Sequence, residues 1–359
     1  MYKKNGKCRL IQRSIMLMLM ILLEINVSFA QKIEHPEWGF KDFPADSVFY
    51  VRELSQIAVQ TAIFKAYAAK GGTVYLPPGI IKVTNNIMMM SNVKLKGALN
   101  KDGSRATTLS ASKYLFEGVI MARTGTNNTT VENLIINGNG IDGHGIAYVY
   151  GPTNFLIANC EIKNIGYTKI DTSIEALKTL ADNPSAILIW SDKNPAKNFT
   201  IKNNVAKNYC RHGVAIHNGQ YFIIENNYFE NGSMGYDTGG FALHGEILGN
   251  EVVDCIFGAK IAGYDSEGIK DIIVHNNNHH NLDETPYYDP GYGDNGWSTD
   301  SGTALVIQGN GKGVVVKNNI LSGVTVEKSI AFWGKAKKDA IIESNESMPS
   351  PPFKKAKVK

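Results

Sequence analysis

Cysteine is scarce in this chain. The 359 residues include four cysteines, and Cys8 lies in an N-terminal segment that we expect to be removed. Cys160, Cys210 and Cys255 remain, and an odd number of cysteines is a poor basis for a disulfide framework in an exported protein. We therefore expect these three side chains to be small buried hydrophobic residues.

Long hydrophobic runs are also missing, apart from one near the N-terminus. Five cationic residues between Lys3 and Arg13 precede an apolar run over residues 15–23, and small residues follow before Gln31. An apolar run this short, with these flanks, is typical of a cleavable signal peptide rather than a membrane span. The sequence predicts a signal peptide over residues 1–30 and a secreted or periplasmic chain that is not an integral membrane protein.

An excess of charge of one sign is absent once that segment is set aside. The whole sequence has 37 Lys and Arg against 33 Asp and Glu, a formal net charge of +4. Residues 1–30 hold five of the cations and one of the acids, so 32 of each sign remain. This balance gives no support to nucleic-acid binding through bulk charge.

What the chain does have is a repeat that ends in asparagine. An apolar triplet, one spacer and Asn recur with Asn159, Asn203, Asn226, Asn276 and Asn318 as the last residue, while Asn250 fits more loosely and Ser344 replaces Asn in the last copy. Successive steps are 23 to 26 residues long, except for two nearly doubled steps of 44 and 42. Short strands at a period in the twenties predict a parallel β-helix. Asn suits the turns because it tolerates left-handed backbone angles, and stacked Asn side chains can hydrogen-bond along the axis.

The other half of the repeat is a small residue followed by a four-residue strand. Successive strand residues alternate between the two sides of a sheet. The first and third strand residues should therefore point into the core, and the second and fourth should point outward. The predicted inward residues at the first position are Ile146, Ala186, Val214, Phe241, Ala259, Ala304 and Ile330, and the predicted outward residues include His217, His244 and Lys260.

A helix and two insertions complete the predicted domain. Residues 55–70 predict a capping helix that Gly71 and Gly72 end. Its apolar side chains lie roughly on one face: Ile57, Val59, Ala62, Ile63, Ala66 and Tyr67. The two long steps indicate insertions at about residues 166–184 and 278–302, both just before the second type of strand. Long loops on one edge of a rigid scaffold usually carry function. We expect one domain over residues 31–348 and a polar tail over residues 349–359.

These features resemble a known group of proteins. The helix, the segment GGTVYLPPGIIKV and the repeated coils resemble the right-handed parallel β-helix proteins of the pectin-lyase-like superfamily over nearly the whole mature chain. The resemblance implies an all-β, single-stranded right-handed parallel β-helix of about nine or ten coils. The superfamily includes polysaccharide lyases, glycoside hydrolases, uronan epimerases and phage tailspikes, and what it shares is an extended, often anionic glycan in a groove along the sheet. The fold alone does not define a reaction.

The outward alignment gathers cationic and imidazole side chains on a few rungs. It puts His217 and His244 at one outward position of neighbouring rungs and Lys260 one rung further. Proton abstraction beside a carboxylate needs a cation to acidify the α-hydrogen, a base to remove it and an acid for the leaving oxygen. The candidate catalytic residues of such a lyase are Lys260, Arg211, His217, His244, His212 and Asp237.

Three other functions stay open. A glycoside hydrolase needs two carboxylates across the scissile bond, and the candidates are Asp237 with Asp265, Asp294 or Asp300, with Glu246 less favoured. The sequence departs from the polygalacturonase pattern, since Gly143-His144-Gly145 comes early with no Asp pair before it. A uronan C5-epimerase shares the first half of the lyase chemistry, but the Asp-Pro-His segment of alginate epimerases is absent. A non-catalytic glycan-binding β-helix is the alternative outside the enzymes.

The remaining candidates concern ligands and histidines. The second insertion supplies possible sugar-binding residues, whose rings either stack on sugars or pack the loop against the β-helix: Tyr287, Tyr288, Tyr292, Trp297 and Asp300. The resemblance implies calcium as the one candidate cofactor, with Asp237, Asp254, Asp265 and Glu267 as ligands, although no local calcium loop exists. We expect His144 to be a turn histidine bonded to backbone, and His275, His279 and His280 to lie in a solvated turn.

Taken together, these residues favour an exported monomeric enzyme that cleaves an acidic polysaccharide by β-elimination in a groove on the outer face of the β-helix.

Overall fold

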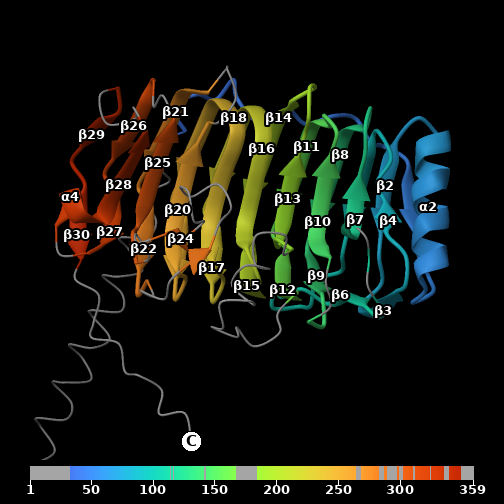
Figure 1. The fold of residues 1–359 in the computed structure, drawn as a ribbon. Coiled ribbons are helices and arrows are strands. Elements are labelled where there is room, and N and C mark those ends of the chain that lie inside the picture. Colours follow the sequence, from blue (N-terminus) through green and yellow to red (C-terminus); the bar gives the residue numbers. More distant parts are fainter. Residues whose placement is uncertain are drawn as a thin grey trace, which may run out of the picture. The chain divides into compact units, whose positions relative to one another are not determined.

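The computed structural model describes residues 33–348, without residues 114, 116, 141–142, 167–183, 264–267, 283–286, 289–296, 299–301, 310–311, 324 and 335–338. At residues 287, 288, 297, 298 and 334 it describes the backbone alone. The chain from His35 onward forms one compact unit. Figure 1 shows its stacked parallel strands with a helix against one end.

The unit is a parallel β-helix whose coils have three faces. The strands of faces 1 and 2 belong to one 18-stranded sheet, and those of face 3 form a 10-stranded sheet. Face 1 consists of β4 (Ile87–Met88), β7 (Gly118–Ala122), β10 (His144–Val149), β13 (Ile187–Trp190), the first half of β16 (His212–Glu225), the first half of β18 (Met234–Leu248), β20 (Phe257–Ala262), β25 (Leu305–Gly309) and β28 (Ile330–Gly334).

Face 2 consists of the second halves of β16 and β18 together with β1 (Val48–Tyr50), β2 (Gly72–Tyr75), β5 (Val93–Lys96), β8 (Asn127–Glu132), β11 (Thr153–Ala158), β14 (Ala196–Lys202), β21 (Ile269–His275), β26 (Val314–Lys317) and β29 (Ile341–Glu343). Face 3 consists of β3 (Gly79–Val83), β6 (Thr107–Ala111), β9 (Leu134–Asn137), β12 (Glu161–Ile165), β15 (Val205–Tyr209), β17 (Tyr228–Glu230), β19 (Glu251–Val253), β22 (Asn278–His280), β27 (Ile320–Ser322) and β30 (Glu346–Met348). The ten strands of face 3 agree with the predicted nine or ten coils.

Among the described residues, two helices and one antiparallel strand pair lie outside the three faces. Helix α2 (Gln56–Ala68) begins after Ser55, whose hydroxyl accepts a hydrogen bond from the Ala58 amide, and it packs against the first strands. Val59 and Ile63 are fully buried there, whereas Ile57, which was predicted to lie on the packed face, is 80% exposed. The remaining elements are the short helix α4 (Val326–Ser329) and an antiparallel pair, β23 (Tyr287–Tyr288) with β24 (Trp297–Ser298).

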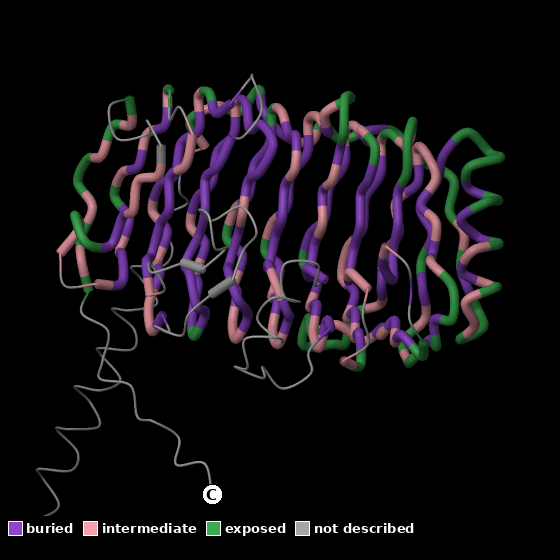
Figure 2. The backbone as a smooth tube through the Cα atoms, viewed as in Figure 1, coloured by how far each residue is buried: buried purple, intermediate pink, exposed green. Residues whose placement is uncertain are grey.

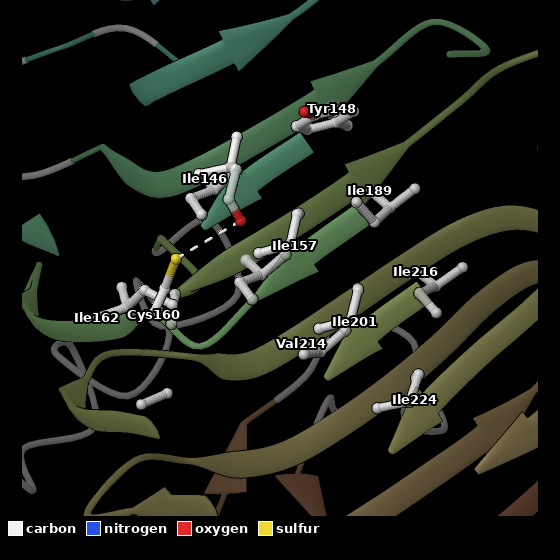
Figure 3. Packing of buried hydrophobic residues seen from close by; sticks show 14 of the residues in the cluster. Ile146, Tyr148, Ile157, Cys160, Ile162, Ile189, Ile201, Val214, Ile216 and Ile224 are labelled. Carbon is white, nitrogen blue, oxygen red and sulfur yellow. Dashed lines mark hydrogen bonds between the residues drawn. The ribbon is translucent and has the colours of Figure 1, made fainter. Parts of the chain in front are cut away.

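Buried residues follow the strands along the stack (Figure 2), and their aliphatic and aromatic side chains fill the interior between the three faces (Figure 3). Ile146, Ile187 and Val214 pair in register on neighbouring rungs of face 1 and all point into this core. Phe155, Phe199 and Phe222 form a stack on face 2, with ring centroids 4.7 and 5.5 Å apart between neighbours. The three described cysteines are free and buried, which confirms the prediction made for them.

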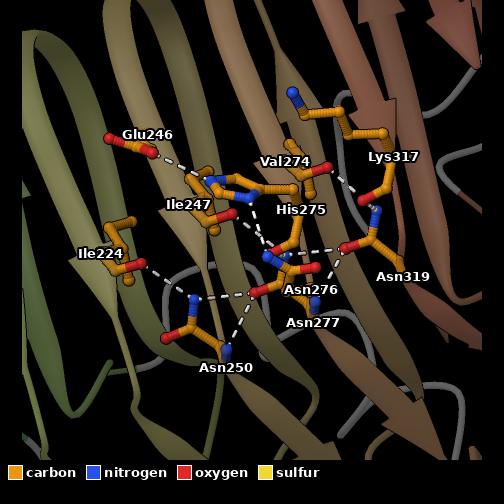
Figure 4. A network of polar contacts seen from close by, with 10 residues as sticks. All are labelled: Ile224, Glu246, Ile247, Asn250, Val274, His275, Asn276, Asn277, Lys317 and Asn319. Atoms are coloured by element: carbon orange, nitrogen blue, oxygen red, sulfur yellow. Dashed lines mark hydrogen bonds and ion pairs between the residues drawn. The ribbon is translucent and has the colours of Figure 1, made fainter. Parts of the chain in front are cut away.

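Asparagine ladders line the turns, as the repeat predicted. The turn residues Asn203, Asn226 and Asn276 have φ values of 55°, 53° and 56°, and Gly249 fills the same place before Asn250. The buried ladder itself is formed by the next residue of each turn. Asn250, for example, donates to the Ile224 carbonyl and to Asn277 Oδ1, at 3.0 and 2.9 Å (Figure 4). Each rung of the ladder thereby satisfies the buried backbone groups of its neighbours.

An N-terminal strap, residues 35–47, lies across the outer surface of face 2. The Gly39 amide donates to the Tyr221 carbonyl, the Phe40 amide to Thr200 Oγ1 and the Lys41 amide to Asn154 Oδ1. The strap then reaches the first coil, where the Thr73 amide donates to the Ser47 carbonyl. It therefore covers outward residues of face 2 rather than of face 1.

The predicted strand register is correct on some rungs and wrong on others. Ile146, Val214, Ala259 and Ile330 point into the core as expected. The prediction is off by one residue at Ala186 and Ala304, because Ile187 and Leu305 fill the inward positions. It is off by five at Phe241, because Tyr236 pairs with Val214.

The largest error has a clear physical reason. The apolar pattern predicts a strand from Phe241, whereas the structure uses Tyr236-Asp237-Thr238, which contains two polar residues that point inward. Both are satisfied there: Tyr236 Oη lies 3.0 Å from His279 Nε2, and Thr238 Oγ1 bonds with the backbone of Ala262. Strand β18 then continues around the corner of the coil, so the apolar residues from Phe241 onward belong to face 2.

Candidate active site

The outward residues of face 1 form three columns along the stack. The entrance column contains His144, Ser185, His212, Met234 and Phe257. The middle column contains Ala147, Leu188, Ala215, Asp237, Lys260, Val306 and Ala331. The far column contains Val149, Trp190, His217, Gly239, Ala262, Gln308 and Trp333.

Asp237 is the centre of a charged cluster on this surface. Its Oδ2 lies 3.6 Å from His212 Nε2, and its Oδ1 lies 3.5 Å from Lys260 Nζ. Its side chain is 13% exposed, against 3% for His212 and 2% for Lys260. The β-pairing causes this contact, because Asp237 and Lys260 occupy the same column on adjacent rungs.

The entrance column connects this cluster to two further polar groups. Ser185 Oγ lies 3.3 Å from His212 Nδ1, and the Ser185 amide donates to His144 Nδ1 at 2.9 Å. The second bond confirms that His144 is bonded to backbone, but His144 is the first residue of β10 rather than a turn residue. Ser185 therefore contacts one ring nitrogen of His212 while Asp237 lies on the side of the other.

Burial keeps both imidazoles neutral. It lowers the pKa of His144 from 6.5 to about 4, and the positive charge of Arg211 acts in the same direction. Burial also lowers the pKa of His212 well below its usual value, with further contributions from Arg211, Lys260 and His144. Arg211 and Lys260 are therefore the cations of the cluster, and Asp237 is its carboxylate.

His217 and His244 do not form the predicted pair. The residue opposite His217 on the next rung is Gly239, since the predicted register of that rung is wrong by five residues. His217 lies beside Trp190 instead, with the two rings nearly parallel at an interplanar angle of 11° and their centroids 6.1 Å apart. His217 thus remains on the candidate surface, in the far column.

His244 lies on face 2 and is not a member of the cluster. It pairs with Asp271 at 3.1 Å, and its ring stacks on Tyr221 at 4.9 Å. Trp38 of the strap contacts it from outside, at a centroid distance of 5.8 Å. These contacts show a residue that helps to hold the strap.

The other histidines also differ from the prediction of a solvated turn. His275 is nearly buried and pairs with Glu246, which is fully buried, at 2.9 Å (Figure 4). His279 is fully buried inside the coil against Tyr236. His280 pairs with Glu251 near the surface. Glu246 belongs to the second half of β18, on face 2, and is therefore not a second carboxylate for Asp237.

Several predicted residues lie outside the described part of the chain. They are Tyr292, Asp265, Glu267, Asp294 and Asp300. Tyr287, Tyr288 and Trp297 are described by their backbone alone, in the pair β23 and β24. Both long connections join a face 3 strand to the next face 1 strand, as predicted, but the second begins after β22 rather than at Asn278.

The described residues do not fit a calcium ion at Asp237. The His212 imidazole and the Lys260 ammonium already lie against its two oxygens, and an ammonium at 3.5 Å repels a metal cation. Asp254, another proposed ligand, follows β19 of face 3. Among the described residues, no group of three or more His, Cys, Asp or Glu is arranged to hold a metal ion.

Sequence analysis did not single out the two apolar patches that flank the cluster. On one side, Trp190 and Leu188 pack on Met121, Ala147 and Val149. On the other, Trp333 and Ala331 pack on a patch made of Met234, Ile256, Phe257 and Val306. The sequence feature that could have indicated these patches is a tryptophan at an outward strand position, where a small or polar residue would be expected.

The comparisons with known proteins agree with the fold. The family model described as "Right handed beta helix region" matches residues 185–347. No curated protein matches the sequence. No helix among the described residues is long and apolar enough to cross a membrane.

Solved structures with the same fold come from both enzymes and phage proteins. A hyperthermoactive exopolygalacturonase from Thermotoga maritima is similar at 12% identity and a TM-score of 0.57, over 87% of this chain and 80% of that one. The N-terminal fragment of gene product 12 from bacteriophage Phi29 is similar at 16% identity and 0.56, over 93% of this chain and 56% of that one. A tailspike protein of E. coli bacteriophage HK620, determined in complex with a pentasaccharide, is similar at 12% and 0.52, over 83% of this chain and 60% of that one. This chain thus covers less than two thirds of the length of each of the two phage chains.

The stacked coils, their parallel pairing and these matches define the class of the protein. It is a right-handed parallel β-helix, a fold whose solved members include an exopolygalacturonase and a phage tailspike in complex with a pentasaccharide.

Proposed function

We propose that the protein is an exported enzyme that cleaves an acidic polysaccharide by β-elimination on the outer surface of face 1. The observation that carries the proposal is the position of Asp237, which is partly exposed and held between His212 and Lys260. A single carboxylate beside the Lys260 ammonium, with the positive charge of Arg211 acting on the neighbouring His212, suits a substrate that carries its own carboxylate.

The roles follow from charge and exposure. The Arg211 and Lys260 cations attract the uronate carboxylate and stabilise the negative charge that develops on it as the α-hydrogen leaves. Asp237 is the most exposed of the three paired groups, and it takes that proton. Neutral His212 contacts its Oδ2 without competing for the substrate carboxylate.

The elimination is then completed without a further reactant. The electron pair of the C–H bond forms a carbon–carbon double bond, and the C–O bond to the leaving sugar breaks. Protonated Asp237 returns its proton to the leaving oxygen, so the carboxylate is restored. One sugar ends in an unsaturated uronate and the other gains a free hydroxyl.

The test is a panel of pectate, alginate, glycosaminoglycans and sulfated algal glycans, followed by two variants on the glycan that is cleaved. Asp237→Asn and Lys260→Gln should each lower turnover by roughly 100-fold or more, while Lys270→Gln, at an exposed site on β21 of face 2, should keep wild-type turnover. Wild-type turnover in both cluster variants would remove the cluster from the reaction.

The same panel separates the other functions. Reducing ends without an unsaturated product would favour a hydrolase that uses Asp237 as its acid. Inversion at C5 without chain cleavage would favour an epimerase. Retained glycan binding with no chemical change would favour a binding protein.

A further inference from the structure

Two tryptophans lie in one outward column, on opposite sides of the charged cluster. The far column passes from Trp190 through His217, Gly239, Ala262 and Gln308 to Trp333, one residue per rung. At about 4.8 Å per rung, the five steps from Trp190 to Trp333 span about 24 Å along the coil axis. Asp237 and Lys260 lie on the two central rungs of this span.

Each tryptophan rests on a rigid base. Trp190 packs on the patch that contains Met121, Ala147 and Val149, and the ring of Tyr150 meets it edge-on at 5.1 Å. Trp333 packs on the patch that contains Met234, Phe257 and Val306. Neither indole is fully buried, so each is held from below and keeps part of its surface in contact with solvent.

The far-column residues beside the cluster are small and buried. Gly239 and Ala262 occupy the far column on the rungs of Asp237 and Lys260, and neither has a side chain larger than a methyl group. Asp237, with a side chain that is 13% exposed against 2% for Lys260, is therefore the more accessible group of the charged pair on these two rungs.

We propose that Trp190 and Trp333 are stacking platforms for two separate sugars of one linear glycan chain, which runs along the coil axis and crosses the cluster between them. An indole presents a flat apolar face, which matches the apolar C–H face of a pyranose ring, and burying both faces is favourable. The nature of the occupant rests on the proposed function. The inference adds that the chain is held on both sides of Asp237, so cleavage is internal and short oligosaccharides are poor substrates.

The test measures binding in a background that cannot cleave. Asp237→Asn protein is titrated with length-ladders of oligogalacturonate and oligoalginate by affinity electrophoresis, alone and combined with Trp190→Ala, Trp333→Ala or both. Each single change should weaken the binding of long chains about three- to ten-fold, and the double change should weaken it further. Trp→Phe at each site should restore part of the affinity, which separates a lost platform from a damaged fold. Tyr50→Ala, at a 72% exposed aromatic of β1 on face 2, is the control and should bind as the background does.

The outcomes distinguish this inference from the proposed function. If the wild-type protein cleaves no glycan of the panel while both tryptophan variants of the background bind long chains more weakly, the result would support the platforms and contradict the lyase. Efficient cleavage by the wild-type active site, with long-chain affinity unchanged in both variants, would support the lyase and overturn the platforms. No binding of any chain by the background protein would also overturn the platforms.

Discussion

At the residue scale, the polar groups of this molecule are informative because burial makes their partners obligatory. Asp237, His212 and Lys260 are nearly covered and paired on the outer surface, whereas His279 and Tyr236 are paired inside the coil. The same residue types therefore have different roles on the outer and the inner side of one sheet. Sequence alone placed Asp237 near the cluster but could not place His279 inside, because an inward histidine needs a partner from another face.

The buried His279 predicts a specific acid sensitivity. Burial lowers its pKa from 6.5 to about 4, so the unfolded chain binds this proton more readily than the folded one. Stability should therefore fall as the pH falls from about 6.5 to about 4, by roughly 3 kcal/mol from this group. In His279→Gln, which keeps a polar partner for Tyr236, that part of the acid loss should disappear in chemical unfolding curves. An unchanged pH dependence would contradict the assignment.

Ser185 is a positioning residue for the proposed reaction. Its hydroxyl lies 3.3 Å from His212 Nδ1, so it helps to fix which ring nitrogen faces Asp237. Ser185→Ala should lower kcat by roughly ten-fold with little change in KM, and should move the pH profile of kcat, whereas Ser185→Thr should restore the wild-type profile. A pH profile that stays the same in Ser185→Ala would limit Ser185 to a structural role.

At the element scale, the repeat predicted the coils better than it predicted their register. The Asn turns fix the length of each coil, and they were found because a left-handed turn restricts the residue type. The register within a strand depends on which residues face inward, and Tyr236 and Thr238 face inward only because His279 and the Ala262 backbone satisfy them. Those contacts link separate rungs, so no local pattern shows them. One consequence was the wrong pairing of His217 with His244.

The buried ladder should carry more stability than the exposed turn residue before it. Asn250 forms bonds along both directions of the stack, to Ile224 and Asn277 and from Asn227. Asn250→Ala leaves those buried groups unsatisfied and should cost roughly 2–3 kcal/mol or more in the free energy of unfolding. Asn226→Gly is the matched control, because Asn226 is exposed at a φ of 53° that glycine adopts without strain. Equal losses in the two variants, measured by denaturant titration, would contradict the ladder account.

At the scale of the whole molecule, the three faces have different outer surfaces. Face 2 is crossed by the strap, which His244 and Tyr221 help to hold. Face 1 has a charged cluster between two apolar patches. The sequence predicted all six proposed catalytic residues on one outer surface, and the structure has five of them on face 1, at the start of or within its strands: Arg211, His212, His217, Asp237 and Lys260. It did not indicate the two tryptophans as a pair, because their alignment needs the correct register of six rungs.

The most direct measurement of the central claim counts two products in one reaction. On the acidic glycan that the protein cleaves, each β-elimination creates one unsaturated uronate and one new reducing end. The account predicts that the two, measured by ultraviolet absorbance and by a reducing-sugar assay, rise in equal amounts from the first time point, and that Asp237→Asn lowers both together. Reducing ends that rise without any unsaturated uronate would contradict the lyase assignment.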